Sequence, residues 1–192
     1  FAYIQSGVAD VCGRFVISEE NVLGIEYQKN FNITPSTYIP IRTRLAPVLM
    51  RWSYGPSWRS DMNLFNCRSE TMHEKPSFKG ANRCLIPFCG WYEWQRTGDE
   101  KIPYFHYSSA HYFGGLYNEI GCLILTRSST EAIRDIHHRQ PVLLSEIDAD
   151  SFLHGENIFD SSANYNVKSH RISIAVNDPR NNDESLIDRV EN

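Results

Sequence analysis

Short strand-forming segments are the feature that most constrains the fold of this chain. Eight runs of four to nine residues are rich in β-branched or aromatic side chains and are bounded by turn residues. These runs are residues 15–18, 38–43, 46–54, 83–88, 104–109, 122–126, 141–145 and 171–176. Short strands that follow one another closely pair most readily as antiparallel sheets, so the sequence predicts a fold dominated by strands.

Helix signals are fewer. Three segments have a serine where a helix N-cap would stand, and they are residues 18–27, 128–138 and 145–155. The chain has 192 residues, with no repeat, no long linker and no run of about 18 apolar residues that could span a membrane. We therefore predict a single β-rich α+β domain with a mainly antiparallel, barrel-like sheet and a few peripheral helices.

The cysteines and the N-terminal segment indicate the compartment. Residues 1–11 have neither a basic start nor a long apolar core, so they do not resemble a secretory signal. The five cysteines are odd in number and form no C-x-x-C pair. A reducing compartment is favoured, either the cytosol or the nucleus. The spacing of His and Cys residues matches no zinc pattern, so we expect no metal and no cofactor.

Positive charge is concentrated in one stretch of the chain. Residues 41–90 hold eight basic and three acidic side chains, together with aromatic residues such as Trp58, whereas residues 91–192 are acidic. Basic side chains interleaved with aromatic ones suit a groove that binds single-stranded nucleic acid. The alternative is a solvated face whose arginines lie over a core. The overall net charge of −4 argues against a purely electrostatic nucleic-acid binder.

Four polar clusters interrupt the apolar segments, and each has a functional and a structural interpretation. Cys12 is followed by a glycine and an arginine, an open and positively charged setting that favours the thiolate, unless Cys12 is, like most cysteines, a small buried hydrophobe. Residues 66–71 form a polar run. Glu93 stands between aromatic residues that would desolvate it and raise its pKa, unless it lies on a strand surface. His137 precedes a proline at a predicted helix end, where it could act in acid–base chemistry or only stabilise the helix terminus.

Eleven short motifs follow one another in a fixed order over residues 12–187. They are CGRF (12–15), FNITPS (31–36), GPSW (55–58), NCRSET (66–71), EKPSF (74–78), RCLIPFCGWYEW (83–94), IPYF (102–105), GGLYNE (114–119), LILT (123–126), IHHRQPVLL (136–144) and AVNDPRNNDESLI (175–187). In this order they resemble the SRAP family, the SOS response-associated peptidases or abasic-site processing proteins. Any one motif is weak, but the ordered set is specific. Two departures are Gln140, where the family often has Met, and Cys67, where it usually has Ala.

The resemblance implies covalent capture of abasic sites in single-stranded DNA. An opened abasic sugar presents an aldehyde, and a cysteine with a free α-amine can close a thiazolidine ring on that carbon. In family terms Cys12 is the nucleophile, and Glu93 would shuttle protons during sugar opening and imine formation. His137 would supply a second acid–base group, and Asn66 would orient the amine or the sugar.

The resemblance also implies how the DNA would be held. Gly13 would leave room for the strand, and Arg14 and Arg68 would bind flanking phosphates because guanidinium groups suit them. Trp58 would lie against a base at the kinked site. The implied partner is single-stranded DNA with abasic sites, with replication-fork proteins as further candidates. We expect a monomer with no membrane association.

The N-terminus departs from the family pattern, in which the cysteine follows the initiator Met. Here Val11 precedes Cys12, so Cys12 has an amide nitrogen until the bond between them is cut. We therefore expect residues 1–11 to be a leader or an added remnant and residues 12–192 to be the SRAP domain. Two alternatives remain open, a cysteine peptidase that removes its own leader and a non-catalytic single-stranded DNA-binding protein.

Overall fold

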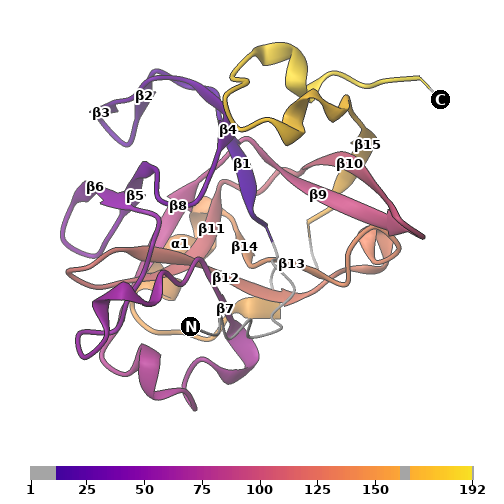
Figure 1. The fold of residues 1–192 in the computed structure, drawn as a ribbon. Coiled ribbons are helices and arrows are strands. Elements are labelled where there is room, and N and C mark those ends of the chain that lie inside the picture. The colour runs from indigo at the N-terminus through magenta and orange to yellow at the C-terminus, as the bar shows by residue number, and fades with distance from the viewer. Residues whose placement is uncertain (1–11, 161–164, 192) are drawn as a thin grey trace.

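Two sheets carry most of the strands in the computed structural model, which describes residues 12–160 and 165–191. The smaller sheet has five antiparallel strands in the order β15-β10-β9-β1-β4. Its strands are β1 (Arg14–Ile17), β4 (Asn30–Ile33), β9 (Gly90–Thr97), β10 (Glu100–Tyr107) and β15 (Lys168–Arg171). In Figure 1 this sheet crosses the upper half of the molecule.

The larger sheet follows the order β13-β12-β11-β8-β5-β6, with β14 beside β11 and β7 beside β12. Its strands are β5 (Tyr38–Arg42), β6 (Pro47–Arg51), β7 (Asn66–Arg68), β8 (Asn82–Pro87), β11 (Tyr112–Tyr117), β12 (Cys122–Ser128), β13 (Arg139–Pro141) and β14 (Leu143–Leu144). Among the described ladders only the pairing of β7 with β12 is parallel. The strands β2 (Asn21–Val22) and β3 (Ile25–Glu26) form a separate hairpin.

The main core lies between the two sheets. Phe15 of β1 contacts the ring of Phe113 of β11 edge to face, with ring centroids 5.6 Å apart. Phe88 stacks on Phe113, with ring centroids 3.9 Å apart. Trp91 of β9 also meets Phe113, at 5.9 Å. Both sheets therefore enclose one aromatic core in a barrel-like arrangement, and the predicted β-rich α+β fold is confirmed.

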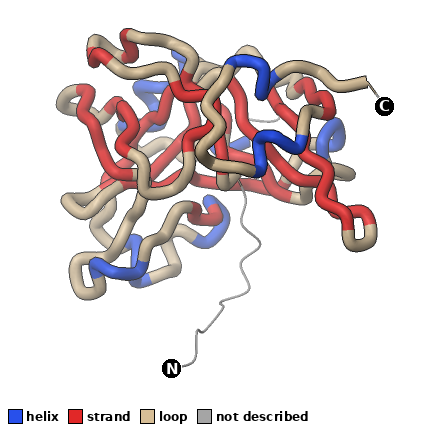
Figure 2. Tube along the Cα trace, turned by 45° about the horizontal axis from the view of Figure 1, so that its top comes forward, coloured by secondary structure: helices blue, strands red, loops and turns tan. Residues whose placement is uncertain are grey.

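The predicted helix over 145–155 is confirmed as α1 (Glu146–Leu153). The Ser145 hydroxyl accepts a hydrogen bond from the backbone N–H of Asp148 at 3.2 Å, and Gly155 follows the helix with a φ of +102°. Phe152 of α1 packs against Gly114 of β11, where a side chain would leave little room. Figure 2 shows that the helical segments are short and lie around the strands.

Seven of the eight predicted strand segments are confirmed, and the predicted helix over 18–27 is wrong. That segment forms the β2–β3 hairpin instead, because Leu23 and Gly24 both adopt positive φ angles, 56° and 80°. Two such residues in succession form a tight hairpin turn that a helix cannot contain. No helix in the described part of the chain is long and apolar enough to cross a lipid bilayer.

Two further predictions are wrong. Residues 128–138 form only a single 3₁₀ turn at Glu131–Ile133, and the N–H of Ser129 bonds to the carbonyl of His138 at 3.0 Å, closing the segment into a loop. Residues 171–176 were expected to be a strand, but they lead into a 3₁₀ turn at Ile174–Asn177. The strand of this region, β15, ends at Arg171.

Candidate active site

Cys12 and Glu93 meet where β1 begins. Arg14 lies opposite Tyr92 in the antiparallel pairing of β1 with β9, and this register brings Cys12 to Glu93. The backbone nitrogen of Cys12 donates a hydrogen bond to Oε1 of Glu93 at 2.8 Å. Both residues are buried, Glu93 to 2 % exposure and Cys12 completely. A nitrogen and a carboxyl 81 positions apart in the sequence are thus in direct contact.

Burial raises the pKa of both the carboxyl and the thiol. It raises the pKa of Glu93 to about 8, against the opposing effect of the hydrogen bond from Cys12. The side chain is therefore mainly a neutral acid at pH 7 and can donate a proton. The pKa of the Cys12 thiol is raised well above its ordinary value, first by burial and then by Glu93. The expected thiolate is therefore wrong for the chain with residues 1–11 attached.

The expected role of Arg14 in activating the thiol fails for a geometric reason. One guanidinium nitrogen donates to the side-chain oxygen of Asn32 at 2.9 Å and to the carbonyl of Val176. Another donates to the carbonyl of Asn177 at 3.4 Å. Arg14 thus joins β1 to the C-terminal segment instead of pairing with Cys12.

A pocket of about 470 Å³ opens beside the Cys12–Glu93 contact. Its lining residues are Gly13, Arg14, Glu93, Trp94, Arg96, Lys101, His137 and Asn177. Arg14, Arg96 and Lys101 give it a cationic wall, which favours an anionic ligand such as a phosphate. A side chain at Gly13 would meet nothing within 4 Å, so the approach is open there, as expected.

His137 lies on the loop that precedes β13. Its Nδ1 is 3.1 Å from both the N–H and the carbonyl oxygen of Arg139, so the backbone fixes the ring's orientation. Gln95 of β9 donates to the carbonyl of Asp135 at 3.0 Å and holds this loop against the smaller sheet. The pKa of His137 is lowered, mainly by burial, which favours a neutral imidazole at pH 7. The site therefore combines a neutral acid with a neutral base.

Three of the predicted residues do not line this pocket. Asn66 begins β7, opposite Ile124 of the parallel partner β12, and is half-buried. Arg68 at the end of β7 is exposed. Trp58 is 63 % exposed on the loop before the 3₁₀ turn at 60–62. Their roles remain predictions, whereas Cys12, Gly13, Arg14, Glu93 and His137 come together.

The sequence interpretation missed four lining residues, namely Trp94, Arg96, Lys101 and Asn177. Arg96 and Lys101 are a cross-strand pair in the β9–β10 hairpin. Their paired positive charges are hard to recognise in the sequence, because residues 91–192 are acidic overall. No residue of the basic stretch 41–90 lines this pocket. The indole N–H of Trp94 donates a hydrogen bond to the side-chain oxygen of Asn177 at 2.8 Å, and the guanidinium group of Arg14 lies over the Trp94 ring.

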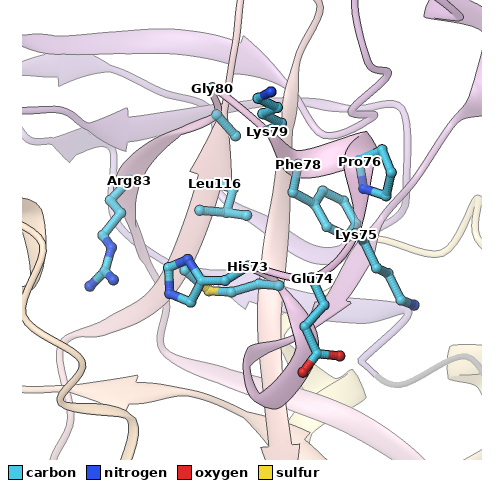
Figure 3. Close-up of a pocket in the computed structure, with 11 residues that line it drawn as sticks. His73, Glu74, Lys75, Pro76, Phe78, Lys79, Gly80, Arg83 and Leu116 are labelled. Atoms are coloured by element: carbon cyan, nitrogen blue, oxygen red, sulfur yellow. The ribbon is translucent and has the colours of Figure 1, made fainter.

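Part of that basic stretch surrounds a second pocket of about 600 Å³, shown in Figure 3. His73, Lys75, Lys79 and Arg83 line this pocket together with apolar residues such as Leu116. This pocket shares no residue with the one beside Cys12 and contains no cysteine. Across residues 12–160 and 165–191, no three His, Cys, Asp or Glu side chains gather as a metal site would require.

The backbone nitrogen of Cys12 thus contacts a buried acid that lines a cationic pocket. The chain belongs to the SRAP family, because the family model described as SOS response associated peptidase matches residues 6–179.

The chain is 30% identical to the abasic site processing protein YoaM of Bacillus subtilis, over 96% of this chain and 95% of YoaM. It is 29% identical to the abasic site processing protein YedK of Escherichia coli, over 70% and 76% of the two chains. The fold is similar to a crystal structure of a Bacteroides thetaiotaomicron protein, with a TM-score of 0.71 and 21% identity over 84% of this chain and 86% of that one.

Proposed function

We propose that this protein captures abasic sites in single-stranded DNA through a covalent bond to Cys12. The observation that carries the proposal is the 2.8 Å hydrogen bond between the Cys12 nitrogen and the buried Glu93 carboxyl, beside a cationic pocket. The nitrogen that would attack the sugar and the acid that would serve it are already in contact. Relatives named for abasic site processing support the choice of substrate.

The reaction needs both nucleophiles of Cys12. Its free amine adds to the sugar aldehyde, and loss of water leaves an imine. Glu93, protonated at pH 7, gives the proton with which the oxygen leaves as water. The thiol then adds to the imine carbon and its proton moves to the nitrogen, which closes a thiazolidine ring. His137 is the second acid–base group, for sugar opening or for reversal of the crosslink.

The DNA would pass over the cationic wall. Arg14 and Arg68 would hold flanking phosphates, Asn66 would orient the sugar or the amine, and Trp58 would lie against a base. The exposure of Trp58 and Arg68 fits contact with a strand that extends beyond the pocket. A single strand fits this proposal because exposed aromatic rings stack on unpaired bases.

The chemistry requires removal of residues 1–11, because the Cys12 nitrogen is an amide while Val11 is attached. A second candidate activity, cleavage of this bond by the protein itself, is favoured by two observations. Cys12 has a φ of +50°, a strained angle for a residue with a side chain, and cleavage would release that strain. In this cleavage the Cys12 thiol would add to the carbonyl carbon of Val11, and the nitrogen would leave as an amine, protonated by the carboxyl to which it is hydrogen-bonded. Water would then hydrolyse the thioester and release residues 1–11.

One denaturing gel tests these activities together. Protein is incubated with a single-stranded oligonucleotide that carries one abasic site and with an intact one. We expect a denaturant-resistant adduct with abasic DNA only, lost in Cys12→Ala but kept in the matched control Cys89→Ala, since Cys89 does not line the pocket. Binding without an adduct would instead indicate a non-catalytic single-strand binder.

The intact mass of the protein, measured before and after incubation, shows whether residues 1–11 are still attached. Loss of residues 1–11 without DNA, and its absence in Cys12→Ala, would support self-cleavage. An adduct formed while residues 1–11 are still attached would rule out the thiazolidine, because an amide nitrogen cannot close that ring.

A further inference from the structure

His106 is a fully buried imidazole on β10 that the proposed chemistry does not use. Neither of its ring nitrogens has a hydrogen-bond partner among the described residues, and the same is true of the indole N–H of Trp91. The two rings lie together, with centroids 5.3 Å apart. Buried polar groups in native proteins are almost always hydrogen-bonded, so a pair of this kind requires a specific explanation.

Strand register places this pair beside Glu93. His106 lies opposite Trp91, and Tyr104 lies opposite Glu93, in the antiparallel ladder of β9 and β10. Residues opposite each other share a face of the sheet, and so do residues two apart on one strand. His106 and Glu93 are therefore diagonal neighbours on the face that also carries Phe15, which is the side of the core.

The loop that carries His137 covers the same face. Gln95, two residues beyond Glu93, holds this loop through its bond to the carbonyl of Asp135. Burial lowers the pKa of His106 to about 3, with smaller effects from His137 on the loop and His170 on β15. The ring is thus neutral, with one nitrogen as donor and the other as acceptor.

We propose that His106 is a positioning residue, which together with the Trp91 N–H holds one buried water against the Glu93 carboxyl. A buried water needs two to four polar partners, and these three groups supply them. The bound water donates to the carboxylate and stabilises its ionised form, so His106 tunes the acid that the proposed function uses. The role of His106 in catalysis rests on the proposed function. The hydrogen bond from the water to Glu93 does not, because it forms without DNA.

The other groups around Glu93 influence its titration independently of His106. The Cys12 nitrogen donates to it, and His137 lines the same pocket from the loop. The charged side chains of that pocket are Arg14, Arg96 and Lys101. His106→Phe keeps a ring against Trp91 and removes both nitrogens. Without the water's hydrogen bond, the titration midpoint of Glu93 should rise by about one pH unit. His106→Gln retains a donor and an acceptor and should restore most of the shift.

The experiment is an NMR titration of the Glu93 carboxyl carbon and the His137 ring in the full chain without DNA, with Tm measured for each variant. A merely structural role would lower Tm and leave the Glu93 midpoint in place, and that result in folded His106→Phe would overturn the proposal. If His106→Phe does not fold, Trp91→Phe removes the indole partner and should raise the midpoint in the same direction. Failure of wild-type protein to form a DNA adduct would refute the proposed function and leave this titration unaffected.

Discussion

Replacing Glu93 with glutamine should make the fold more stable at neutral pH while it removes the chemistry. The carboxyl has a pKa of about 8 in the folded protein and an ordinary value of 4.5. Between these values the unfolded chain is ionised and the folded chain is protonated. Unfolding therefore releases a proton, and the free energy of unfolding falls as pH rises through this window.

The magnitude follows from the two pKa values. Each unit corresponds to about 1.36 kcal/mol, so wild-type protein loses about 3 kcal/mol of stability between pH 4.5 and 7, and about 4 kcal/mol by pH 8, where the folded carboxyl is half ionised. Glutamine is neutral at every pH and does not have this loss. Its extra N–H groups change the hydrogen bonds of the site by an amount that does not vary with pH. The signal is therefore the pH dependence of the difference between variant and wild type.

Urea unfolding followed by tryptophan fluorescence at pH 5, 7 and 8.5 measures this difference. Glu93→Gln should gain stability over wild type as pH rises, while crosslinking to abasic DNA falls by about 10²- to 10⁴-fold. Glu100→Gln, an exposed position on the adjacent strand β10, is the matched control and should follow wild type. A difference between Glu93→Gln and wild type that is the same at all three pH values would refute the buried acid.

Three further outcomes are expected. The buried Cys12 thiol should react with iodoacetamide at least about 100-fold more slowly in the folded chain with residues 1–11 than in urea, and equal rates on peptide mapping would contradict its burial. The double variant Arg96→Gln with Lys101→Gln should weaken single-stranded DNA binding. Titrations at several salt concentrations give the slope of the logarithm of the binding constant against the logarithm of the salt concentration, and its magnitude should fall by about 1.4. An unchanged slope would exclude phosphate contacts at these two residues. Ser145→Ala should lower the free energy of unfolding by about 1 kcal/mol through loss of the α1 cap, whereas no change in urea denaturation would show that the cap is unimportant.

Local sequence was enough to predict the elements whose physics is local. Alternating or continuous apolar runs identified most strands, and Ser145 with Gly155 set the limits of α1 because capping is decided within a few residues. The same reasoning failed at residues 18–27. A single Gly24, with Leu23 also in the left-handed region, turned the chain back into a hairpin, and nothing in a serine cap signal reports that angle.

The sequence by itself determined the family, through the order of its motifs, and named Cys12, Asn66, Glu93 and His137 as a catalytic set. Tertiary structure alone decided that Cys12 and Glu93 are in contact, that Arg14 is held by Asn32 and the C-terminal segment, and that burial raises the pKa of the Cys12 thiol. The physical reason is that protonation and orientation depend on desolvation and on partners far along the chain. A short sequence window contains neither of these, because the Cys12 nitrogen and its partner Glu93 lie 81 positions apart.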